Sequence, residues 1–155
     1  MKNLLTFCVF FLLLFSCTPE KETFSKTIFI NSTADTVFVR AMMNGSIDTT
    51  HSFDLAPLDS IEKHLNTYHG ERLLNGEAFS LAITIMDSMV VSFGDRFVAV
   101  HQSHRYTGDT TRIIPYSSTR NLYNIKSYYR TVAENSRNFR SVIYYYTFNE
   151  DDIMP

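Results

Sequence analysis

The 155-residue sequence has no tryptophan, two cysteines, five glycines and four prolines. Because glycine and proline are so few, the turns must rely on the short polar side chains of Asn, Asp and Ser. Both cysteines, Cys8 and Cys17, lie near the start, so no disulfide can form within the rest of the chain. The sequence also lacks an excess of one charge: the formal net charge is -2, and no basic patch supports nucleic-acid binding.

Hydrophobic residues make up 45% of the chain and charged residues 19%, which is enough apolar material for one domain with a packed core. Thirteen Phe and nine Tyr, together with many Thr, Val and Ile, favour strands over helices. Roughly seven short strands with turn signals between them predict a mainly β fold. We expect an antiparallel β-sandwich or a partly open barrel that forms a single domain over residues 27–155.

One long apolar run is present, at residues 4–15, and it follows a lysine at position 2. A cationic start, an apolar stretch and a small residue at its end predict a helical secretory signal peptide over residues 1–16. The run is shorter than the roughly twenty apolar residues that a bilayer-spanning helix needs. We therefore expect the leader to be removed rather than to remain as a membrane span.

The leader ends in Leu14, Phe15, Ser16 and Cys17. These residues resemble the lipobox of bacterial lipoproteins, which has an aliphatic residue, then a small residue just before the cysteine that is acylated. The resemblance implies cleavage before Cys17 and attachment of lipid, with fatty acids such as palmitate, to that residue. Two or three acyl chains make a stable anchor. It further implies a lipoprotein of the cell envelope, in the outer membrane, with the periplasmic or surface face left open. The polar residues 17–26 then form a flexible tether.

Several segments have the patterns of strands and turns. Residues 26–30 and 36–42 are predicted to pair as a hairpin across the turn-forming segment 31–35. Residues 89–93 and 96–102 flank Gly94 and Asp95 and form the clearest hairpin. The strongest strand is expected at residues 140–148, followed by a short helical turn at 149–152. Further expectations are a loop at 43–48, a strand at 51–58, a connection at 63–76, a buried strand or helix at 79–86, an irregular segment at 103–116 and a weaker strand at 122–129.

The C-terminal half carries a second resemblance. Its motifs are a strand that begins with Asp87 and Ser88, the turn at Gly94, and a closing segment at residues 144–152. They are similar to those of small uncharacterised lipoproteins of Bacteroides-type bacteria, which implies location and fold but no chemistry. The same bacteria attach O-glycans where Asp precedes Ser or Thr. This pattern is equally typical of a turn that enters a strand, so both interpretations are kept. It occurs at Thr36, Thr49, Ser60, Ser88 and Thr110.

Five histidines raise the question of a metal site: His51, His64, His69, His101 and His104. Zinc needs three or four converging ligands, and residues three apart on a strand point to opposite faces. His101 and His104 would therefore not share a ligand direction, and we expect neither a metal nor another cofactor. The sequence also lacks the Gly-x-Ser-x-Gly elbow and the phosphate-binding glycine loop of common enzymes. A small envelope hydrolase or a metal-dependent enzyme remains the alternative to a non-enzymatic protein.

A tyrosine cluster gives the clearest indication of binding: Tyr123, Tyr128, Tyr129, Tyr144, Tyr145 and Tyr146. Because side chains alternate along a strand, Tyr145 should point away from its two neighbours. Exposed tyrosine is favoured at protein and glycan interfaces. We expect a binding surface that includes Tyr128, Tyr129 and Tyr145. The function expected from the sequence is that of a membrane-anchored, non-enzymatic β-domain that binds a protein or a glycan or serves the structure of the cell envelope.

Overall fold

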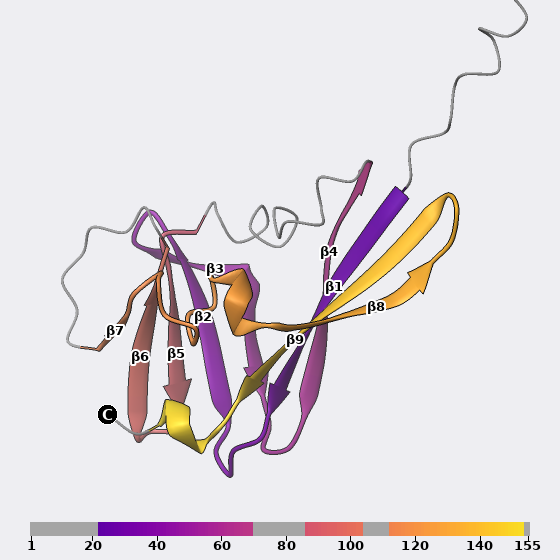
Figure 1. Cartoon of the computed structure of the whole chain (residues 1–155). Helices are drawn as coiled ribbons and strands as arrows, with labels where there is room; N and C mark the ends of the chain where they lie inside the picture. The colour runs from indigo at the N-terminus through magenta and orange to yellow at the C-terminus, as the bar shows by residue number, and fades with distance from the viewer. Residues whose placement is uncertain (1–21, 70–85, 104–111, 154–155) are drawn as a thin grey trace, which may run out of the picture.

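The structure is a computed structural model that describes residues 22–69, 86–103 and 112–153. It consists of two β-sheets that pack face to face as a sandwich (Figure 1). One sheet, called sheet A here, has four strands in the order β4-β1-β9-β8, and sheet B has five in the order β3-β2-β5-β6-β7. The predicted β-sandwich is confirmed, and the described residues form nine strands where about seven were predicted. The strands are β1 (Glu22–Asn31), β2 (Val37–Met43), β3 (Ser46–Leu55), β4 (Ser60–His69), β5 (Ser88–Phe93), β6 (Phe97–Gln102), β7 (Ile113–Ile114), β8 (Tyr129–Asn135) and β9 (Phe139–Phe148).

The core lies between the two sheets and is rich in aromatic rings. Phe29 of β1 occupies its centre, with ring centroids 4.8 Å from Phe53 and 6.3 Å from both Tyr146 and Phe148. Strand β9 contributes alternate residues, and β2 and β5 of sheet B face them with Val37, Val39, Ala41, Val91 and Phe93, all buried. This period of two is what places one face of each strand in the core.

Three predicted elements are confirmed. Strands β5 and β6 pair from Phe93 and Phe97 outward around the turn at Gly94, whose φ of +52° suits glycine. Strand β9 spans residues 139–148, where the strongest strand is expected. The short helical turn follows as the 3₁₀ helix η3 (Glu150–Asp152), and the backbone N–H of Asn149 donates to Asp152 Oδ2 at 2.9 Å.

The predicted hairpin between residues 26–30 and 36–42 is wrong. Strand β1 pairs with β4 and, in parallel, with β9, whereas β2 belongs to sheet B. Segment 31–35 therefore carries the chain from one sheet to the other. The buried Asn31 organises this crossing, because its amide nitrogen lies 2.7 Å from the carbonyl oxygen of Asp35 and its Oδ1 accepts from the backbone N–H of Thr33 at 2.9 Å. An Asn side chain can bond to backbone groups in a crossing between sheets as well as in a hairpin turn, so its presence does not distinguish the two.

Three further expectations need correction. The loop expected at residues 43–48 is a two-residue turn, because Asn44 and Gly45 both have positive φ and let β2 and β3 pair directly. Strand β4 occupies residues 60–69, part of which was expected to be a connection. The strand expected at 122–129 is instead buried coil and the 3₁₀ helix η2 (Ile125–Ser127), and β8 begins only at Tyr129. The segment 79–86 lies outside the described residues except for Met86, which is buried.

Sheet A extends beyond the sandwich at the end where β1 begins (Figure 1). There the first half of β1, the turn between β8 and β9 and the last residues of β4 lie together. Strand β1 starts at Glu22 and so includes residues 22–26, which were predicted to belong to the flexible tether. The strand was not predicted because these residues are mostly polar, although Thr23 and Ser25 are buried on the inner side of the sheet. Within the described ranges, no helix is long and apolar enough to cross a bilayer.

Candidate functional site

The tyrosines of β9 are divided between two faces, as the alternation predicts. Tyr144 and Tyr146 point into the core and are 2% and 1% exposed, whereas Tyr145 is partly exposed on the outer face of sheet A. Tyr129, the first residue of β8, lies directly opposite Tyr145 and is 71% exposed. Their ring centroids are 6.1 Å apart, and the ring planes are tilted by 39°. The two rings form an aromatic pair, called the tyrosine pair here, on the outer face.

Apolar side chains lie near the tyrosine pair on the outer face. Register places Ile28 of β1 beside Tyr145, with Ile30 and Ile143 next along their strands, and all three are partly exposed. Phe24 and Phe139 pack together nearer the start of β1, with ring centroids 4.9 Å apart, and Lys26 and Ser141 lie between them and the isoleucines. Exposed apolar side chains grouped around an aromatic pair are typical of interaction sites.

Tyr128 belongs to the core and not to the outer face. It is 8% exposed, its ring centroid lies 5.2 Å from that of Tyr146, and its hydroxyl donates to the carbonyl oxygen of Leu122 at 2.7 Å. Burial raises the pKa of this phenol well above its ordinary value. The sequence cannot reveal this position, because Tyr128 ends the 3₁₀ helix η2 and precedes the strand in which alternation applies. The predicted binding surface therefore retains Tyr129 and Tyr145.

A second candidate is an open cleft of about 480 Å³ between sheet B and the C-terminal turn. Its apolar wall comes from β6 and β7, and the guanidinium of Arg112 lies 4.3 Å from the ring centroid of Phe97 at this wall. The opposite wall is formed by Arg120 and the residues of η3. The cleft could hold a small ligand with an apolar body and an anionic group, since a cation over an aromatic ring is placed to meet an anion.

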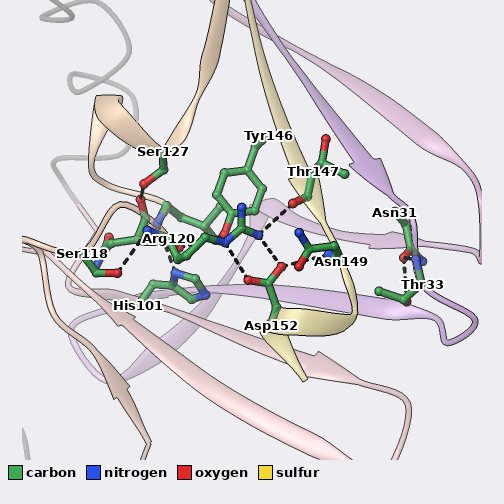
Figure 2. Close-up of polar contacts among 12 residues, drawn as sticks. Asn31, Thr33, His101, Ser118, Arg120, Ser127, Tyr146, Thr147, Asn149 and Asp152 are labelled. Atoms are coloured by element: carbon green, nitrogen blue, oxygen red, sulfur yellow. Dashed lines mark hydrogen bonds and ion pairs between the residues drawn. The ribbon is translucent and has the colours of Figure 1, made fainter. Parts of the chain in front are cut away.

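The ion pair of Arg120 and Asp152 closes one side of this cleft (Figure 2). Arg120 Nε donates to Asp152 Oδ1 at 2.8 Å, and Nη2 donates to Asp152 Oδ2 and to the carbonyl oxygen of Thr147, the latter at 2.8 Å. The hydroxyl of Tyr146 donates to the carbonyl oxygen of Arg120 at 2.8 Å. Burial lowers the pKa of Arg120, but the hydrogen bonds and charge of Asp152 outweigh it and leave the pKa raised. This wall ties the loop before η2 to the C-terminal turn.

His101 lies beneath the same loop and is 3% exposed (Figure 2). Its Nδ1 accepts a hydrogen bond from the backbone N–H of Leu122 at 3.1 Å, so a neutral ring carries its proton on Nε2. Burial, followed by the positive charge of Arg120, lowers the pKa of His101 to about 3. The ring is therefore neutral at physiological pH, and the contact shows it acting as an acceptor that holds the loop.

The described histidines do not converge. His51 lies on β3, where its Nδ1 is 2.9 Å from Asp48 Oδ2, whereas His101 lies on β6, with β2 and β5 between the two strands. The hydrogen bond from His51 is the main reason that the pKa of Asp48 is lowered. The neighbouring Ser52 hydroxyl donates to the main chain of Asp48 at 2.6 Å, so it supports an irregular stretch of β3 and is not paired with the imidazole. The side chains of His64, His69 and His104 lie outside the described residues.

No group of three or more His, Cys, Asp and Glu side chains that could hold a metal ion occurs within residues 22–63, 86–103 and 112–153. The candidate O-glycosylation positions differ in exposure. Thr49 and Ser60 are exposed, Thr36 is partly exposed and Ser88 is 4% exposed in β5; Thr110 lies outside the described residues. Only an exposed hydroxyl can meet a glycosyltransferase in the folded state, so Thr49 and Ser60 are the most accessible of the four positions that the structure describes.

Comparison with known proteins gives no match: no family model, no curated protein and no solved structure resembles the chain closely enough to count. A function for the chain therefore has to be inferred from the surfaces of the molecule itself. The outward position of Tyr145 could be predicted from the sequence, because side chains alternate along β9. The cleft could not be predicted from the sequence, because Arg120 and Asp152 are thirty-two residues apart and neither stands in a recognisable motif.

Proposed function

We propose that the chain is a lipid-anchored, non-enzymatic binding protein of the cell envelope that holds a protein partner on the outer face of sheet A. The observation that carries this proposal is the tyrosine pair, in which Tyr129 is 71% exposed beside Tyr145. Aromatic side chains supply large contact areas at small conformational cost and are enriched at the centres of protein interfaces.

A protein partner suits this face better than a glycan does. Glycan sites combine a stacking ring with several hydrogen-bonding side chains, whereas the neighbours of the tyrosine pair include the aliphatic side chains of Ile28, Ile30 and Ile143. Two charges on this face pair with each other, since Lys26 Nζ lies 2.6 Å from Glu62 Oε2. An apolar centre with a paired charge at its rim is the usual anatomy of a protein interface. Glycan binding is the alternative outcome of the test below.

The anchor is proposed from the leader and from Cys17. The apolar run of residues 4–15 ends at this cysteine, which is the one thiol left once the leader is removed. Cys17→Ser should abolish incorporation of labelled palmitate and leave the precursor unprocessed. Mass spectrometry of the purified protein should find an acylated amino terminus at residue 17. Labelled palmitate in the mutant, or an unacylated mature amino terminus elsewhere, would contradict the anchor.

The binding face is tested with the double variant Tyr129→Ala/Tyr145→Ala. Membranes that contain the wild-type protein are treated with a photo-crosslinker, and the amount of each crosslinked species is compared between variants. We expect a species that the double variant loses and that Tyr116→Ala retains, because Tyr116 is 46% exposed but lies outside the outer face. A glycan array run in parallel detects the alternative ligand. Equal crosslinking by wild type and double variant would exclude the face as the binding site.

A further inference from the structure

The first described residue of the chain lies beside the turn between β8 and β9. Glu22 is in register with Phe139 in the parallel pair of β1 and β9, and its N–H donates to the carbonyl oxygen of Asn138 at 2.9 Å. This end of sheet A extends beyond the sandwich, on the side where the chain enters the fold (Figure 1). Whatever is attached upstream of Glu22 is therefore attached at this end, which we call the entry end.

The distance from the proposed anchor to the entry end is short. Five residue steps separate Cys17 from Glu22, and even a fully extended chain covers at most about 18 Å in five steps. The polar headgroup layer of a leaflet is itself about 5–7 Å thick. If acyl chains on Cys17 enter the bilayer, the entry end must stay close to the headgroups.

The entry end carries the side chains that such a position favours. Phe24 is 36% exposed and packs against Phe139 on the outer face. Arg137 is exposed at the turn itself, whereas Arg140, the next residue along β9 after Phe139, is half-buried with its Nε inside the fold. Aromatic rings and an exposed arginine that can snorkel are residues that settle at the interface between lipid and water.

The charges near the entry end balance, with Arg137 and Arg140 against Glu22 and Glu134. Arg130 lies farther along β8, opposite Tyr144 and next to the tyrosine pair. Attraction of side-chain charges to an anionic surface falls off within a Debye length, so balanced charges add little to membrane binding. We therefore expect contact with neutral lipid through the rings and little change with anionic lipid.

We infer that the entry end of sheet A rests on the bilayer surface as a second membrane contact beside the lipid on Cys17. The inference rests on the proposed anchor, and it adds an orientation to it. Strand β9 then leads away from the membrane, because it begins at Phe139. Six strand steps, at most about 20 Å, separate Phe139 from Tyr145. The tyrosine pair is thereby held at a fixed height above the lipid, where a partner in the envelope can reach it.

Single tryptophans test this orientation, since the chain has no natural tryptophan. Phe139→Trp and Phe24→Trp each place the reporter at the entry end, and either one suffices if the other fails to fold. Val98→Trp is the matched control: Val98 is 49% exposed on β6 of sheet B, close to the turn at Gly94. The processed chain, residues 17–155, is coupled through Cys17 to a maleimide lipid in phosphatidylcholine vesicles, with and without phosphatidylglycerol and with and without brominated acyl chains.

We expect the tryptophan emission of the Phe139→Trp variant to shift to shorter wavelength on vesicles and to lose intensity with brominated lipid, while the Val98→Trp control keeps its emission. Unquenched emission at both places, or equal quenching at both, overturns the inference. Because the maleimide lipid supplies the anchor chemically, this outcome does not depend on acylation in the cell. Failure of palmitate labelling on Cys17 would instead contradict the proposed lipid anchor. The quenching experiment would still show whether the entry end contacts the bilayer when the chain is attached through Cys17.

Discussion

The buried imidazole of His101 makes the stability of this fold depend on pH in a predictable way. The pKa of His101 falls from its usual 6.5 to about 3 in the folded protein, mainly because burial disfavours the charged ring. Between these two values the unfolded state binds a proton that the folded state does not. Stability therefore rises with pH through this window, is complete above about pH 6.5, and is lost progressively as the pH falls towards 3.

The size of the effect follows from the shift. One pKa unit corresponds to about 1.4 kcal/mol, so the whole window represents about 5 kcal/mol as an upper estimate. At pH 5, about one and a half units below the usual pKa, the expected loss is about 2 kcal/mol. That is a large fraction of the stability of a small domain. Most carboxyl groups titrate nearer pH 4, so the interval between pH 7 and 5 reports mainly on histidines.

Urea unfolding of the processed chain at pH 7 and pH 5 measures this loss for the wild type and for His101→Asn. An Asn side chain can still accept the hydrogen bond from Leu122 N but cannot take up a proton. We expect the variant to be less stable at pH 7 but to lose about 2 kcal/mol less on acidification. His51→Asn, on the partly exposed edge strand β3, is the control and should keep the wild-type loss. An equal loss in wild type and His101→Asn would refute the reasoning.

Local signals in the sequence account for the parts of the fold that were predicted. Residues 139–148 alternate between core and surface, and the turn at Gly94 joins two strands that are neighbours in sequence. The parallel pairing of β1 with β9 has no such signal, because the strands are over a hundred residues apart. Edge strand β8 was missed for a related reason: nearly all its residues are exposed, so it lacks the alternation that marks a half-buried strand.

In the candidate site, too, local sequence patterns predicted some positions and tertiary packing set the others. Period two within β9 was enough to point Tyr145 outward, and the register with β8 then brought Tyr129 opposite it. Tyr128 lies one residue before that register begins, and the 3₁₀ turn that precedes it aims its ring into the core. At the boundary of an element, tertiary packing sets the direction of a side chain, and the local sequence pattern does not reveal that packing. The contact between His101 and Leu122 is tertiary in the same sense.

Two buried polar networks give the remaining predictions. Asn31→Ala should cost about 3 kcal/mol in urea unfolding, because three main-chain carbonyls at the crossing between the sheets lose their partner; a loss below about 1 kcal/mol would show that water replaces the amide there. Arg120→Met should cost about 2 kcal/mol, since it leaves the nearly buried carboxylate of Asp152 without its cation. The double variant Arg120→Met/Asp152→Leu should recover part of that loss, because it removes the stranded charge as well. If the double variant is less stable than Arg120→Met by the full cost of a second deletion, the two residues act independently and the ion pair does not hold the C-terminal turn.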